Sequence, residues 1–201
     1  MNSDPDLSLS SRPPLPDQGA VRRLGLRLFL LSLTVFFAAS MVAFTAIRLT
    51  KPDKVDSIRV PPVMWLSTVI LLLAGMAMEG SAQYARTARQ PEVNRWLKIA
   101  MGFGVVFLAV QSLAMARLLE LHTISLTQDA IVGLHGVTFV LILIHAIHVV
   151  GGIVPLGMLT ARAHSDTLTL DCLPHVRSVA TYWHFLEVVW VCMLVMFYVA
   201  F

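Results

Sequence analysis

Five long apolar segments constrain this chain more than any other feature of its sequence. They run at about 24–49, 62–83, 97–119, 130–161 and 179–201. Each is long enough to cross a hydrocarbon core of about 30 Å, which takes about 20 helical residues. Backbone groups in lipid must be paired, and these segments lack the alternation of a membrane β-barrel. We therefore expect an all-α fold: a polytopic membrane protein that forms a bundle of five transmembrane helices.

Composition supports a membrane protein and excludes several other classes. Hydrophobic residues make up 57% of the 201 residues, and charged residues make up only 13%. A soluble domain carries about 25% charged residues. An ordinary soluble enzyme, a disordered chain and a nucleic-acid-binding domain are therefore excluded.

The chain divides into a short tail and one domain. Residues 1–20 are polar and rich in Ser and Pro, which predicts a disordered tail. Residues 24–201 form the predicted five-helix transmembrane domain. The connections between segments are short, so consecutive helices should be antiparallel neighbours.

The distribution of Lys and Arg predicts the orientation of the chain. Ten of the fifteen Lys and Arg residues lie near the amino terminus or near the second and fourth connections. The other five lie near the first and third connections, on the opposite side of the membrane. Cytoplasmic loops carry an excess of Lys and Arg. We therefore expect a cytoplasmic amino terminus and an external carboxyl terminus.

Polar residues inside the apolar segments are the candidates for function, because each costs free energy in lipid unless it has a partner. His145 and His148 are three residues apart and share a helix face, as do His184 and Glu187. We expect these four to form one polar seam between the fourth and fifth helices, where they lock the bundle through hydrogen bonds. The alternatives are that the histidines bind haem or a metal ion, as in a small membrane b-type cytochrome, or that Glu187 serves a proton-coupled transporter.

The last two segments carry sequence patterns of a known family. Residues 182–190 read YWHFLEVVW, and residues 144–152 read IHAIHVVGG. These patterns closely resemble the last helices of subunit III of haem-copper oxidases, with Glu187 where the family mostly has Asp. Ser67, Thr68 and Gly75 fit a looser pattern in the second segment, and Gln111 fits one in the third.

The resemblance implies a fold and a role. Members are bundles of five or seven helices, and this chain would be the five-helix form. It would be a subunit of an oxidoreductase complex without catalytic residues of its own, with haem and copper in the partner subunits I and II. Its location would be the inner (plasma) membrane of a bacterium. Subunit-III-like proteins of nitric oxide reductases are a second branch to which it could belong.

Two further expectations concern lipid and protons. The resemblance implies bound phospholipid, and the short basic connection with Arg86, Arg89 and Arg95 supplies candidate headgroup contacts. Two acids of the family's first and third helix patterns are replaced by Leu33 and Ala114. A proton-related contribution of this chain is therefore left open.

Overall fold

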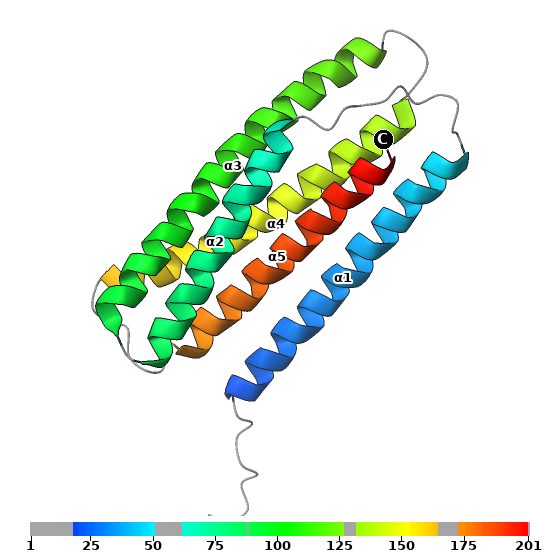
Figure 1. Cartoon of the computed structure of the whole chain (residues 1–201). Helices are drawn as coiled ribbons and strands as arrows, with labels where there is room; N and C mark the ends of the chain where they lie inside the picture. The colour runs from blue at the N-terminus through cyan, green and yellow to red at the C-terminus, as the bar shows by residue number, and fades with distance from the viewer. Residues whose placement is uncertain (1–17, 51–61, 88, 127–131, 165–172, 201) are drawn as a thin grey trace, which may run out of the picture.

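The computed structural model describes residues 18–50, 62–87, 89–126, 132–164 and 173–200. These residues form five helices (Figure 1): α1 Gln18–Thr50, α2 Pro62–Arg86, α3 Gln90–Leu126, α4 Val132–His164 and α5 Leu173–Ala200. All five are long and apolar enough to cross a membrane. The predicted all-α bundle of five membrane-spanning helices is therefore confirmed.

The helices are longer than the apolar segments that predicted them. The third begins at Gln90 instead of 97, and the fifth at Leu173 instead of 179. An apolar segment marks only the part of a helix that lies in hydrocarbon, whereas the helix continues into the headgroup region with polar side chains. Arg95 consequently lies on α3. Of the predicted tail, residues 1–17 lie outside the described residues, and Gln18–Ala20 are already helical.

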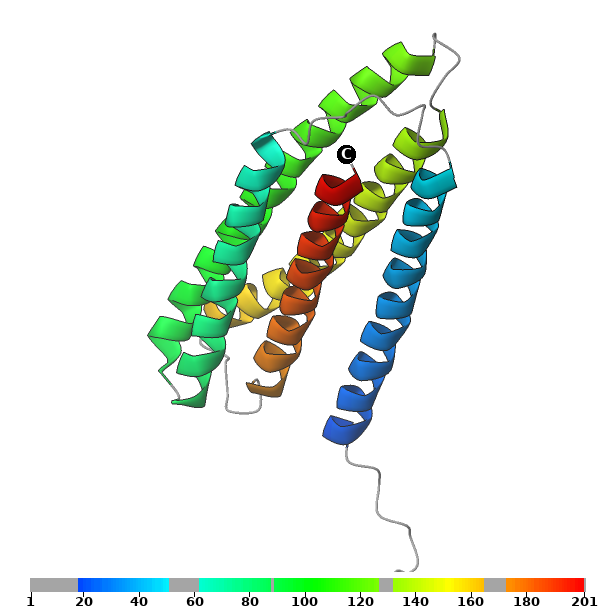
Figure 2. The ribbon, with the colours of Figure 1, turned by 45° about the vertical axis from the view of Figure 1, so that its right-hand side comes forward.

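Helix α5 occupies the centre of the bundle. It packs against α2, α4 and α1, while α3 packs mainly on α2 and α4. Figure 2 shows α5 standing between α2 and α1, with α4 behind it. Half of the α5 span is buried within the chain, compared with 11% of the α1 span. Helix α1 is therefore the most loosely packed of the five.

Large aromatic side chains fill the core around α5. Trp183 and Trp190 are both buried. The Trp190 ring stacks on His145 with centroids 5.2 Å apart and meets Phe107 of α3 edge-on at 5.9 Å. Its indole Nε1–H donates a hydrogen bond of 2.9 Å to the Thr68 hydroxyl of α2. One side chain thus connects α5 to three neighbouring helices.

Candidate functional site

The four residues of the predicted polar seam lie in two separate clusters. His184 and Glu187 turn toward α2, where His184 meets Glu79 and Glu187 lies against Gly75. His145 and His148 lie on α4, against rings from α1 and α5. Among the described residues, no hydrogen bond joins the α4 histidines to His184 or Glu187. The four residues therefore do not form one continuous seam, because α5 presents its His–Glu face to α2 and meets α4 through Tyr182, Leu186 and Trp190. Their role in locking the bundle stays a prediction.

The first cluster joins two carboxylates through one imidazole. His184 Nδ1 lies 2.9 Å from Glu187 Oε2, and His184 Nε2 lies 3.5 Å from Glu79 Oε2. Glu187 is buried against α2 beside Gly75. A Cβ atom at Gly75 would lie only 1.5 Å from Glu187 Oε1, so a larger residue here would displace the carboxylate from its present position. The cluster connects α2 with α5 through polar contacts.

The second cluster is enclosed by aromatic rings. His145 is fully buried, and neither of its ring nitrogens has a hydrogen-bond partner among the described residues. His148 Nδ1 donates to the Ile144 carbonyl of its own helix at 2.7 Å, and its ring packs edge-on against Phe37 at 5.5 Å. Within the described part of the chain, no three His, Cys, Asp or Glu side chains are grouped so that they could hold a metal ion.

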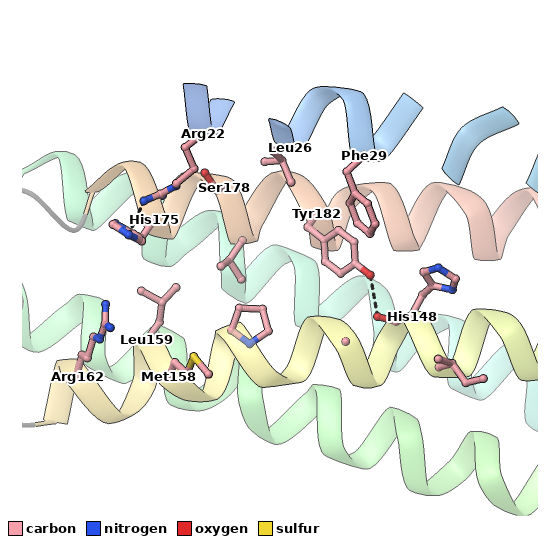
Figure 3. Close-up of a pocket in the computed structure, with 14 residues that line it drawn as sticks. Arg22, Leu26, Phe29, His148, Met158, Leu159, Arg162, His175, Ser178 and Tyr182 are labelled. Atoms are coloured by element: carbon pink, nitrogen blue, oxygen red, sulfur yellow. Dashed lines mark hydrogen bonds between the residues drawn. The ribbon is translucent and has the colours of Figure 1, made fainter. Parts of the chain in front are cut away.

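A cleft lies between α1, α4 and α5 (Figure 3). It has a volume of about 650 Å³, and most of its lining is apolar: Leu26, Phe29, Ile147, Pro155, Met158 and Leu159. Arg22, Arg162 and His175 line it at one end, where Arg22 and His175 are hydrogen-bonded to each other. Toward the other end, the Tyr182 hydroxyl donates 2.9 Å to the His148 carbonyl, and the Tyr182 ring stacks on Phe29.

The length of the cleft matches one membrane leaflet with its headgroup layer. Ile147 and Arg162 are separated along α4 by about 22 Å at a rise of about 1.5 Å per residue. Half of the hydrocarbon core is about 15 Å thick. The cleft is therefore a long, mostly apolar space with two arginines at one end.

The arginines predicted to contact headgroups do not line this cleft. Arg86 ends α2, Arg89 lies in the turn before α3, and Arg95 lies on α3; all three are exposed. The end of α2 and the start of α3 lie at the same end of the bundle as the start of α1 and the end of α4, which carry Arg22 and Arg162 (Figure 1). Sequence reasoning missed Arg22, Arg162 and His175. Their one visible signal is that both arginines directly flank apolar segments, and nothing in the sequence shows that α1, α4 and α5 enclose a common space.

The fold and the site define an integral membrane protein with helical spans, internal polar contacts and a mostly apolar cleft. Comparison with known families then gives a specific assignment. The family "Cytochrome c oxidase subunit III" matches residues 18–200. The chain belongs to this family, which confirms the resemblance seen in its last two segments.

Relatives are found in distant organisms. Cytochrome c oxidase subunit 3 of Bacillus subtilis (strain 168) is 25% identical over 87% of this chain and 84% of its own length. Cytochrome bo(3) ubiquinol oxidase subunit 3 of Pseudomonas putida is 22% identical over 90% and 87%. Cytochrome c oxidase subunit 3 of Hippopotamus amphibius is 26% identical over 88% of this chain and 68% of its own length.

The structure gives a physical role to the pattern at residues 182–190. The Tyr182 hydroxyl contacts the α4 backbone, and Glu187 lies against Gly75 of α2. Trp183 packs so closely on α3 that a Cβ at Gly104 would lie 3.0 Å from its ring. The polar and aromatic residues of this pattern therefore connect α5 to its neighbours inside the bundle.

Proposed function

We propose that this chain is a non-catalytic membrane subunit of a haem-copper respiratory oxidase, in which it stabilises the catalytic subunit. Family membership over residues 18–200 supports the oxidase assignment. The observation that carries the non-catalytic role is that the polar groups of α5 make helix–helix contacts: Tyr182 with α4, and His184 and Glu187 with α2. These groups are used in building the bundle.

The partners follow from the same assignment. The chain would pack against the catalytic subunit I, with subunit II in the same complex. Haem and copper would be held by those partners, which carry out oxygen reduction linked to electron transport. Relatives named as subunits of a cytochrome c oxidase and of a ubiquinol oxidase leave cytochrome c and quinol as the two candidate electron donors.

A bound phospholipid belongs to the proposed function. Its anionic headgroup would contact Arg22 and Arg162, and one acyl chain would follow the apolar lining of the cleft. The lipid would then fasten α1, the least buried helix, to α4 and α5. Arg86, Arg89 and Arg95 would contact headgroups of the surrounding membrane at the same end of the bundle.

The orientation is supported by the arrangement of charges in the bundle. Among the residues that the structure describes, Lys and Arg gather at the end where α1 begins, and only Arg48 and Arg117 lie toward the other end. The positive-inside rule places the crowded end in the cytoplasm. We therefore propose a bacterial plasma membrane protein with its amino terminus inside.

Purification of the tagged chain in mild detergent tests this function. A visible spectrum is recorded on the eluate and on the chain after its separation from partners, and the partners are identified by mass spectrometry. We expect haem and a large polytopic subunit in the eluate and no haem in the isolated chain. A nitric oxide reductase as partner would assign the chain to that branch.

Two results would contradict the proposal. Stoichiometric haem in the isolated chain would make the histidines ligands of a small membrane cytochrome. An eluate without haem and without a partner would favour the transporter alternative.

A further inference from the structure

Two polar side chains are open to the outside of the bundle at a depth where the membrane is hydrocarbon. The side chain of Glu79 is 45% exposed, and that of His184 is 43% exposed. Glu79 lies about 10 Å along α2 from its end at Arg86, and His184 lies about 16 Å along α5 from its start at Leu173. Both residues lie inside the apolar segments 62–83 and 179–201, about 6 Å and about 8 Å from the polar ends of those segments.

This cluster has fewer hydrogen-bond donors than acceptors. Glu79 and Glu187 together offer four carboxylate oxygens, whereas the imidazole of His184 offers at most two N–H groups. Oε1 of Glu187 is buried and has no hydrogen-bond partner among the described residues. The side chain of Glu79 is partly exposed, so its carboxylate is accessible to a further donor. Both carboxylates contact His184, and an external donor to the partly exposed Glu79 would give its carboxylate a second partner.

The surface around the cluster is suited to close contact with another helix. On α5 the exposed side chains next to His184 include Val188, Val191 and Val195, which are small and stiff. On α2, Met76 is exposed one turn from Glu79. Figure 2 shows α5 between α2 and α1. We call this surface, around Met76, Glu79, His184 and Val188, the α2–α5 face.

We infer that the α2–α5 face is the docking surface for the catalytic subunit, one of whose transmembrane helices presents a hydrogen-bond donor to Glu79. The inference rests on the proposed function, and it adds which face of the bundle contacts the catalytic subunit. A hydroxyl, an imidazole or a cationic side chain on that helix would supply the missing donor. Lipid hydrocarbon offers no donor, so in lipid alone the partly exposed Glu79 carboxylate would have only its contact with His184 among the described residues.

Photo-crosslinking in the intact complex tests the face. A benzophenone amino acid replaces Val188 on the α2–α5 face or, as the matched control, Val105 on the exposed side of α3. The two valines are similarly exposed, at 61% and 51%. Met76 is a second position on the face, in case the change at Val188 prevents folding. Adducts are identified by mass spectrometry, and haem in the purified sample shows that the complex is intact.

We expect adducts with the catalytic subunit from position 188 or 76 and none from position 105. Adducts from 105 alone, adducts with a second copy of this chain, or an intact complex without adducts from 188 and 76 would overturn the inference and leave the proposed function standing. A sample without haem and without any partner would contradict the proposed function, and the inference with it.

Substitution of Glu79 tests the hydrogen bond. Loss of a hydrogen bond to a charged group costs about 1.5–3 kcal/mol, or about ten- to a hundredfold in affinity. We expect Glu79→Leu to lower the haem recovered with the tagged chain at least about tenfold. Glu79→Gln, which keeps one acceptor, should lower it less. Glu92→Leu, which removes a carboxylate from the first turn of α3, is the control. Equal recovery in Glu79→Leu and Glu92→Leu would overturn the assigned donor contact.

Discussion

At the scale of single residues, the bundle depends on matched pairs of one small and one large partner. Gly75 makes room for the Glu187 carboxylate, Gly104 for the Trp183 ring, and Gly152 for Tyr182 and Leu186. Helices in lipid gain little from the hydrophobic effect, so close packing and interhelical hydrogen bonds hold them together. A change of one methyl group at such a position should therefore be measurable.

The first prediction concerns Gly75. In Gly75→Ala the new methyl group overlaps the Glu187 carboxylate, and we expect a loss of about 1–3 kcal/mol in stability, the usual cost of overpacking. Gly102→Ala is the matched control, because a Cβ at Gly102 on α3 meets nothing within 4 Å. Thermal unfolding of both variants in detergent measures the difference. Equal melting temperatures would contradict the close approach of Glu187 to α2.

The second prediction concerns the hydrogen bond between Trp190 and Thr68. Trp190→Phe removes the indole donor, and Thr68→Val removes the acceptor. A double-mutant cycle should give a coupling energy of about 0.5–1.5 kcal/mol. A double-mutant cycle between Trp190 and Ser67 is the control. The Ser67 hydroxyl donates to a carbonyl of its own helix, so this cycle should give no coupling energy. A coupling near zero in both cycles would show that the indole N–H does not bond to Thr68.

At the scale of helices, α1 differs from the other four. Its span is the least buried, and it encloses the cleft together with α4 and α5. The basic end of the cleft draws Arg22 from α1 and Arg162 from α4. Two like charges at one site repel each other unless an anion lies between them. A bound anionic lipid would therefore contribute to the docking of α1.

The third prediction follows from this arrangement. We expect Arg22→Gln or Arg162→Gln to reduce the anionic phospholipid that remains bound after detergent washing, by about fivefold for a contact of about 1 kcal/mol. Native mass spectrometry of the purified complex measures the bound lipid. Arg27→Gln is the control, because Arg27 is exposed on the same helix but does not line the cleft. Similar losses in all three variants would show that the lipid depends on the overall positive charge at this end of the bundle and not on the cleft.

At the scale of the whole molecule, the polar and charged groups gather in three separate regions of the bundle. The cationic side chains gather at one end, the cleft opens between α1, α4 and α5, and the cluster of Glu79, His184 and Glu187 lies between α2 and α5. An odd number of spans places the two termini on opposite sides of the membrane.

The fourth prediction concerns this orientation. Alkaline phosphatase, which is active only outside the cytoplasm, should be active when it is fused after Phe201. Green fluorescent protein, which matures in the cytoplasm, should be fluorescent at the amino terminus and dark at the carboxyl terminus. As controls, each of the two reporters is also fused to the other terminus. The reverse pattern would invert the topology and would require the charges of the residues outside the described ranges to dominate.

The amino-acid sequence by itself determined the helices, their number and the family. Membrane helices need about 20 apolar residues, and that demand is local, so it can be read directly from the chain. The pattern at residues 182–190 likewise identified the family from neighbouring residues alone. The helix ends were less accurate, because the polar turns of α3 and α5 extend beyond the hydrocarbon.

Only the tertiary structure decided which helix faces meet. In lipid, both the outward and the inward sides of a helix are apolar, so hydrophobic periodicity does not show the inward side. His184 and Glu187 were therefore assigned to the wrong neighbour, and Glu79 was not joined to them. The meeting of Arg22, Arg162 and His175 is equally non-local, because it depends on the packing of α1 against α4 and α5.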